Sequence, residues 1–203
     1  MDWRSDITKA ITVQQACMRV DVDGLWEYSL PELRASEQEI ADAERQLGCR
    51  LPEQYRSFLL YANGWRCFYQ DVHLFGTSDL RGGKLFDRVR EFLQIDIDDG
   101  PEGALDFDID DVLPIAASMT QTDTFVIGKV GTPKEGHVIW QAGGVIEEYD
   151  SFVEYFRAMV AYDKMQAEAL AKEHGIEGEP RFVVPLFEDE LESEEQKENR
   201  KDS

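Results

Sequence analysis

The sequence predicts a single α+β domain, a mostly antiparallel β-sheet with helices packed on one side of it. Three observations support this fold class. Residues 36–64 have the pattern of two short helices, residues 113–149 contain four strand candidates separated by turns, and a long helix is indicated after Ser151. Helix and strand patterns thus occupy separate stretches of the chain, as is typical of α+β proteins.

The two short helices are predicted from their ends. Ser36 and Glu39 can form a capping box at the start of the first helix, and Gly48 can end it in a left-handed conformation. Leu51-Pro52 begins the second helix, because a proline at the first helical position loses no hydrogen bond. Asn63-Gly64 ends it.

The sheet is predicted from alternation and turns. A first strand is indicated over residues 72–75, and the later candidates are Leu113–Ala117, Thr124–Val130, Gly136–Gln141 and Val145–Tyr149. Because Gly131-Thr132-Pro133 and Gly143-Gly144 supply turns between them, an antiparallel meander is expected.

Three further helices are indicated around this meander. One covers residues 5–18, with Ser5 or Asp6 as its cap. A short one covers residues 85–93, and a longer one begins at the capping box Ser151-x-x-Glu154.

The chain is expected to divide into four parts. These are an N-terminal helix and connection (1–35), the α+β domain (36–175), an extended apolar segment (176–187) and an acidic tail (188–203). The tail has eight acidic and three basic residues and almost no apolar ones. It is predicted to be disordered, because it cannot bury enough apolar area to offset the entropy of ordering.

These motifs, in this order, resemble the SUKH superfamily, whose members are similar to the yeast Smi/Knr cell-wall regulators and to many bacterial immunity proteins. The matching residues are Ile40, Glu44, Leu47, Gly48, Leu51, Pro52, Tyr55, Phe58, Leu59, Asn63 and Gly64, followed by Trp140 and Phe152. The resemblance covers about residues 30–165. It implies the same α+β fold, a structural role for the motif residues, and a non-catalytic binding module.

Composition restricts the partners. With 42 acidic and 21 basic residues, the formal net charge is −21. Bare nucleic acid and anionic membranes would repel such a chain, whereas a basic protein would attract it. The alternative interpretation is that the acidity only confers solubility.

Cysteine usage and the N-terminus predict a cytoplasmic protein. The three cysteines are an odd number without a Cys-x-x-Cys pair, which favours reduced thiols. The first residues have no apolar run of the kind that a secretory signal contains, and no stretch is long enough to span a bilayer.

The most acidic window is 94–111, which contains no lysine or arginine and is predicted to be a loop around Gly100-Pro101 and Gly103. Its acidic residues are Asp96, Asp98, Asp99, Glu102, Asp106, Asp108, Asp110 and Asp111. Two interpretations remain, a partner-binding loop and a solvated acidic loop. An EF-hand is rejected, because Asp111 and Ala117 occupy the positions that require Gly and Glu. A looser divalent-ion site is kept only as a minor alternative, so no metal is expected.

Trp65 and Tyr69 are aromatic candidates for a partner-binding hot spot, with core packing as the alternative. Trp140 is expected to share one face of its strand with Val138, because side chains alternate along a strand.

Motifs for catalysis are missing from the sequence. A phosphate loop fails around Gly83-Lys84, since Ser78 and Leu85 replace the required residues, and there is no Gly-x-Ser-x-Gly elbow. We therefore expect no enzyme activity and no cofactor.

The family resemblance implies an immunity protein that neutralises a toxin, often a nuclease, in the producing bacterial cell. An acidic protein can occupy the basic groove of a nuclease as a polyanion. The alternative is a Smi/Knr-type intracellular regulator or scaffold that acts through protein contacts.

Overall fold

The computed structural model describes residues 2–99 and 107–187, and the side chains of residues 96–99 are outside that description. Within these residues the helices are α1 (Trp3–Val20), α2 (Glu37–Leu47), α3 (Glu53–Leu59), α4 (Thr77–Leu80), α5 (Lys84–Asp99) and α6 (Phe152–Glu173), with a 3-10 turn η1 (Ile109–Asp111). The strands are β1 (Trp65–Tyr69), β2 (Val72–Leu74), β3 (Val112–Ser118), β4 (Thr124–Gly128), β5 (Val138–Gln141) and β6 (Val145–Tyr149). The α+β class is confirmed.

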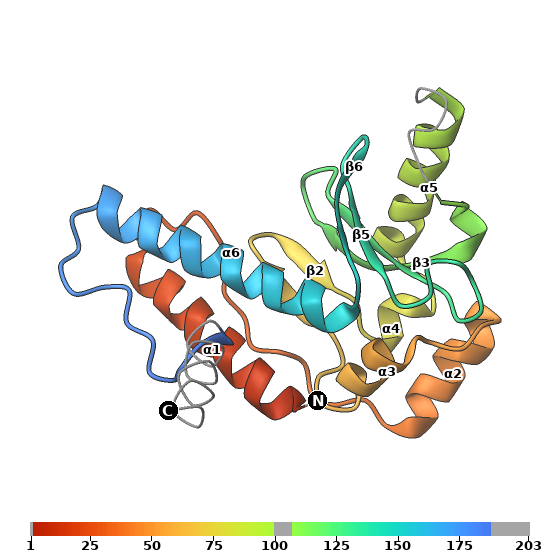
Figure 1. Ribbon diagram of the computed structural model, residues 1–203, viewed down its shortest axis with the longest axis horizontal. Coiled ribbons are helices and arrows are strands. Elements are labelled where there is room, and N and C mark those ends of the chain that lie inside the picture. The colour runs from red at the N-terminus through yellow and green to blue at the C-terminus, as the bar shows by residue number, and fades with distance from the viewer. Residues whose placement is uncertain (1, 100–106, 188–203) are drawn as a thin grey trace, which may run out of the picture. The chain divides into compact units, whose positions relative to one another are not determined.

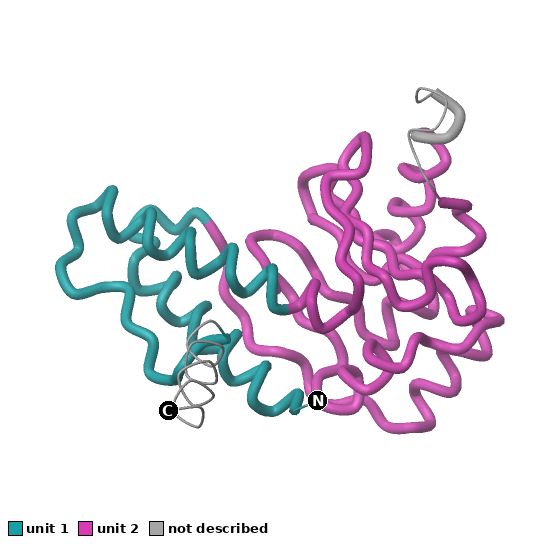
Figure 2. The backbone as a smooth tube through the Cα atoms, in the orientation of Figure 1, with its two compact units in different colours: residues 1–25, 157–203 teal, residues 26–156 magenta. Residues whose placement is uncertain are grey.

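The chain forms two compact units (Figure 2). Unit 1 comprises residues 1–25 and 157–203, and unit 2 comprises residues 26–156. Helix α6 begins in unit 2 and continues into unit 1, so one continuous helix belongs to both.

The sheet lies in unit 2, and its strands pair antiparallel in chain order from β1 to β6. The predicted meander is confirmed as β3 to β6, and β2 confirms the predicted strand at residues 72–74. Every residue of β3 and β4 is buried, so both faces of these strands are covered. β6 is an edge strand, and four of its five residues are not buried.

Aromatic side chains fill the interior of unit 2. The ring of Phe58 on α3 lies 5.4 Å from Phe152 and 5.7 Å from Phe156, both in the first turns of α6. Phe68 of β1 stacks on Phe156 at 4.8 Å, and Phe125 of β4 lies 5.1 Å from Tyr155. These contacts join the start of α6 to α3 and to the sheet.

The other helices of unit 2 pack around one end of the sheet and along it. Helix α4 contacts both α2 and α5, and α5 packs against β3 (Figure 1). This arrangement brings the end of α2, the middle of α5 and the start of β3 together.

The predicted capping signals are largely confirmed. The Ser36 hydroxyl accepts a hydrogen bond from the Glu39 amide (3.2 Å), and the Ser36 amide donates to the Glu39 carboxylate (2.8 Å). Gly48 ends α2 with φ +72°. Helix α3 begins one residue later than predicted, with Pro52 at the cap position. At the start of α6, the Ser151 hydroxyl accepts from the Glu154 amide (3.2 Å).

Three predicted helix ends are wrong. Helix α3 ends at Leu59, before Asn63-Gly64, because the amides of Tyr61 and Ala62 both donate to the Phe58 carbonyl and turn the chain there. The cap of α1 is Asp2, which accepts from the amides of Arg4 and Ser5, and Asp6 is instead buried. Helix α5 continues to Asp99, so residues 94–99 are helical and not part of a loop. The reason is that the first helix-breaking residues after Leu93 are Gly100 and Pro101, and acidic residues alone do not stop a helix.

Two elements were not predicted. β1 contains Cys67 at φ +48° and an irregular register with β2, which interrupts the alternation that identifies a strand. Helix α4 has only four residues, too few for a periodic pattern.

The segment 176–187 packs within unit 1 and forms no strand in its described residues. Leu186 is buried, and the Phe187 ring lies 4.6 Å from Lys9 Nζ and 4.9 Å from Arg157 Cζ. Arg19 binds the Glu179 carboxylate at 3.3 Å. The predicted disorder of residues 188–203 lies outside the described residues.

Candidate functional site

The acidic window predicted to bind a partner is divided among three structural contexts. Asp96, Asp98 and Asp99 form the end of α5, and nothing is described of their side chains. Glu102 and Asp106 lie outside the described residues. Asp108, Asp110 and Asp111 lie at η1, immediately before β3.

The η1 turn is held by hydrogen bonds to its backbone, with Asp110 exposed and Asp111 half-buried. The Asp108 carboxylate accepts from the Asp110 amide at 2.9 Å. Lys129 of the β4–β5 connection donates from Nζ to the Asp110 carbonyl (2.6 Å) and from its amide to the Asp111 carbonyl (2.8 Å). This lysine thus binds main-chain oxygens, and within the described part of the chain no cation forms an ion pair with the Asp110 or Asp111 carboxylate.

The structure places the two aromatic candidates differently. Trp65 is 1% exposed, and its indole nitrogen donates to the Ser29 carbonyl at 2.9 Å, so the core-packing alternative describes this residue. Tyr69 is partly exposed and meets Trp140 edge to face at 6.3 Å. The Trp140 nitrogen donates to Asp123 at 2.7 Å. Tyr69 is therefore the one of the two whose ring also reaches the surface.

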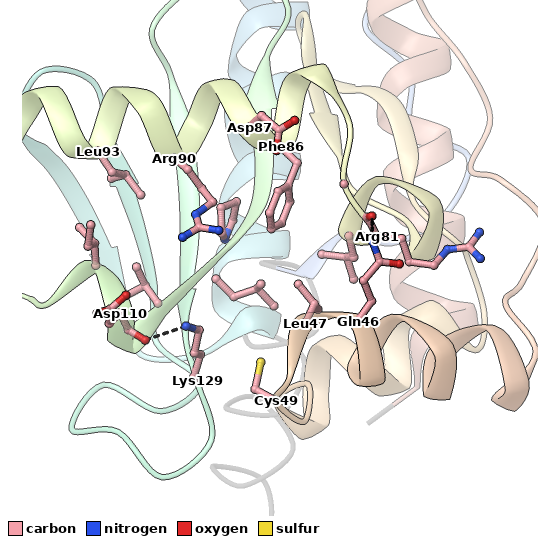
Figure 3. A pocket seen from close by; sticks show the side chains of 16 residues that line it. Gln46, Leu47, Cys49, Arg81, Phe86, Asp87, Arg90, Leu93, Asp110 and Lys129 are labelled. Carbon is pink, nitrogen blue, oxygen red and sulfur yellow. Dashed lines mark hydrogen bonds between the residues drawn. The ribbon is translucent and has the colours of Figure 1, made fainter.

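A hollow of about 350 Å³ lies beside α5 in unit 2 (Figure 3). We call it the α5 hollow. Residues from α2, α4, α5, η1, β3 and the connections beside them line it, among them Leu47, Cys49, Phe86, Arg90, Leu113 and Lys129. In Figure 3 the Arg90 side chain points into the hollow from α5, while Lys129 and Cys49 point into it from the opposite side. The sequence analysis missed this site.

The polar residues at the hollow are set against an apolar wall. Leu80, Phe86, Leu93 and Leu113 are each at most 7% exposed. Burial raises the pKa of the Cys49 thiol, and the nearby Lys129 ammonium opposes that shift. The thiolate fraction of Cys49 at neutral pH is therefore lower than that of a free cysteine.

The comparison with family models decides the classification of unit 2. The model of the SMI1 / KNR4 family (SUKH-1) matches residues 34–158, which is more than half of the chain. The chain belongs to the SMI1 / KNR4 family. A comparison with curated proteins found no match.

The SMI1 / KNR4 match and unit 2 cover nearly the same residues, 34–158 and 26–156. Most of unit 1 therefore lies beyond the family match. The acidic turn η1, the α5 hollow and Tyr69 all fall inside it.

The SMI1 / KNR4 motif residues that the sequence analysis identified form the interior and the junctions of unit 2. Ile40, Tyr55, Phe58 and Leu59 are each 0% exposed. The Tyr55 hydroxyl donates to the Phe75 carbonyl at 2.7 Å, and Glu44 accepts from the Leu51 amide at 3.0 Å. Glu44 thereby holds the turn between α2 and α3.

Asn63-Gly64 is the motif pair with the tightest packing. The Asn63 side chain accepts from the Thr77 amide at 2.7 Å, which satisfies the first turn of α4. A Cβ atom on Gly64 would lie 2.6 Å from the Gly76 nitrogen, and one on Gly76 would lie 2.1 Å from the Asn63 carbonyl oxygen. Glycine at both positions lets the connection before β1 approach the start of α4.

Among the described residues, no three His, Cys, Asp or Glu side chains are grouped so as to hold a metal ion. In the same residues, no helix has both the length and the apolar character that crossing a bilayer requires.

Proposed function

We propose that this chain is a non-catalytic protein-binding module that neutralises a cognate toxin, as an immunity protein, by covering a basic surface of that toxin. The observation that carries the proposal is the acidic excess, a formal net charge of −21 on a member of a family of binding modules. A nuclease is the toxin class that fits best, because its substrate groove must be basic.

The exposed surface of unit 2 supports protein binding. Asp110 is exposed at η1, and the edge strand β6 exposes Val145 (39%) and Ile146 (56%) close to the acidic Glu147 and Glu148. Among the described residues no strand pairs with the outer edge of β6, and its apolar and acidic side chains suit a partner that presents apolar and basic ones.

In the described structure a cysteine and a histidine lie close together without the pKa shifts of a catalytic pair, which supports a non-catalytic role. Cys67 Sγ lies 3.8 Å from His73 Nε2 in the β1–β2 hairpin. Burial raises the pKa of the Cys67 thiol and lowers the pKa of His73. An activated pair needs the opposite shift at sulfur, because the thiolate is the nucleophile.

The test begins with affinity capture of the partner from the native cell and identification of the captured protein. Surface plasmon resonance then compares the wild type with the triple variant Asp108→Asn, Asp110→Asn, Asp111→Asn. Asparagine keeps the oxygen through which Asp108 caps η1. The matched control is Glu168→Gln, Glu173→Gln, Glu177→Gln, which changes the net charge equally at exposed positions in unit 1.

The acidic turn is expected to act on the encounter rate. The triple variant should associate about tenfold more slowly at low salt and show a flatter salt dependence, because steering by complementary charge acts mainly on association. The control should keep the steep dependence. Equal association rates for the wild type and the triple variant at both ionic strengths would contradict the role of η1.

A cell assay tests the immunity role itself. Expression of the captured partner should kill cells, and co-expression of this chain should restore growth. A partner that is harmless to cells would overturn the immunity role and favour the Smi/Knr-type regulator or scaffold.

A further inference from the structure

We propose that the α5 hollow binds a small amphipathic anion, a molecule with a carboxylate or phosphate head and a short apolar body. This proposal does not depend on the immunity role, because its head-group contacts are Arg90 and Lys129, although Asp110 of the acidic turn also lines the hollow.

The size and the wall of the α5 hollow suit a small molecule. Its volume of about 350 Å³ falls in the lower part of the range of small-molecule sites. Phe86, Leu93 and Leu113 supply apolar surface from α5 and β3. A ligand without an apolar body would leave this surface in contact with water and would gain little from the site.

Two cations supply the head-group site. Arg90 is exposed, and its guanidinium has neither an ion pair nor a hydrogen bond within the described part of the chain. Lys129 uses one donor on the Asp110 carbonyl, and an ammonium group has three. Both side chains point into the hollow, whereas the Asp87 carboxylate and the Arg81 guanidinium point away from it (Figure 3).

The charge at this site contrasts with the rest of the molecule. A chain of net charge −21 repels anions in general, whereas Arg81, Arg90 and Lys129 outnumber Asp87 and Asp110 among the residues that line this hollow. A guanidinium fork binds a carboxylate or a phosphate through two parallel hydrogen bonds. The charge and the wall together therefore select an anion with an apolar body over a cation or a neutral molecule.

Cys49 makes occupancy measurable in the intact protein. Its thiol lines the hollow, whereas Cys17 and Cys67 are 2% and 8% exposed. N-ethylmaleimide should therefore modify Cys49 first, and mass spectrometry of the digested protein reports the rate for each cysteine. The labelling is followed at one fixed alkaline pH with octanoate, octyl phosphate, octanol or octylamine.

The expected result is slower Cys49 labelling with octanoate and octyl phosphate, in proportion to occupancy. Octanol should protect far less, and octylamine should not protect. The relative affinities of octanoate and octyl phosphate distinguish a carboxylate from a phosphate head. If octanol protects as well as octanoate, or if neither anion protects, the proposal is overturned.

The Arg90→Gln variant tests the head-group contact. It should bind octanoate about tenfold more weakly by titration calorimetry, because one charged hydrogen-bonding partner is lost. Arg45→Gln on α2 is the matched control, since Arg45 is exposed and pairs with Asp42 away from the hollow. Thermal melting of both variants checks that they fold. Equal octanoate affinity in wild type and Arg90→Gln would also overturn the proposal.

Discussion

The two units of this protein have different interiors. In unit 2, the polar residues that are buried in the described structure are the neutral Thr77, Ser118, Thr124 and Gln141. In unit 1 the buried set includes ionisable groups, namely Asp6, Lys9, Asp21 and Asp163. Burying a charged group costs free energy unless the charge is paired. The free energy of unfolding of unit 1 should therefore depend on pH, whereas that of unit 2 should depend mainly on packing.

Within unit 1 the buried acids are compensated unequally. Asp6 is 4% exposed at its side chain and pairs with Arg157 at 3.2 Å. Asp163 has no ion pair in the part of the chain that is described, and burial raises its pKa well above the ordinary value of an aspartate. The contrast between the units therefore depends most strongly on Asp163.

The largest expected effect comes from the aromatic interior of unit 2. Phe58→Ala should lower the free energy of unfolding by about 3–5 kcal/mol, because Phe58 is 0% exposed and contacts Phe152 and Phe156. Leu59→Ala, also at 0% exposure, should cost about 2–5 kcal/mol. Urea unfolding at several pH values measures both losses, which should be the same at each pH.

The control for this packing effect is Tyr61→Ala, since Tyr61 is 47% exposed and should cost less than about 1 kcal/mol. If the loss of unfolding free energy in Phe58→Ala changed with pH, packing alone would not account for the stability of unit 2.

The second prediction concerns the glycine junction of unit 2. Gly76→Ala should destabilise the protein by about 1–3 kcal/mol, because the new Cβ would meet the Asn63 carbonyl oxygen at 2.1 Å and the backbone would have to move. Gly83→Ala is the matched control, since its Cβ would meet nothing within 4 Å. Thermal melting compares the two. Equal melting temperatures would show that the connection at Asn63-Gly64 does not pack tightly against the start of α4.

Much of the fold of unit 2 was predictable from local chemistry. Residues close together in sequence determine the capping box at Ser36, the left-handed conformation of Gly48 and the turns of the meander. β1 was missed because its alternation breaks at Cys67, whose positive φ follows from the register shift with β2. The end of α5 was misplaced because charge was treated as a helix breaker.

The candidate sites were less predictable than the fold. The acidic turn was identified because its carboxylates are adjacent in the chain. The α5 hollow depends on Cys49, Arg90 and Lys129, which are at least 39 residues apart and come from three different parts of unit 2. No local pattern marks such a set, since the packing of α5 on β3 brings it together. Trp65 was ambiguous for a related reason, because composition does not distinguish a core indole from an exposed one.

The third prediction tests the ionisable interior of unit 1. Because the folded-state pKa of Asp163 is raised, the folded protein holds this proton more tightly than the unfolded chain does. The contribution of protonated Asp163 to the free energy of unfolding is thus fully present below the pKa of an unfolded aspartate. That contribution is lost as the pH rises through the higher pKa of the folded state. Asp163→Asn should stabilise the protein at neutral and alkaline pH and have little effect in acid.

Melting temperatures across the pH range measure the Asp163→Asn difference. Glu168→Gln, at an exposed position on the same helix, should leave the pH profile unchanged. A constant difference between Asp163→Asn and wild type at every pH would remove the contrast between the two units.

The smallest effect is expected at the C-terminus of unit 1. Removal of residues 188–203 should leave the circular dichroism and the melting temperature almost unchanged, because eight acidic and three basic residues with almost no apolar ones supply too little apolar area to stabilise a fold. Removal of residues 186–203 is the control. It also deletes the buried Leu186 and the Phe187 ring beside Lys9 and Arg157, and should cost about 1.5–3 kcal/mol. If the shorter deletion were as damaging as the longer one, the acidic residues would have to stabilise unit 1 directly, and the packing of unit 1 would extend beyond Phe187.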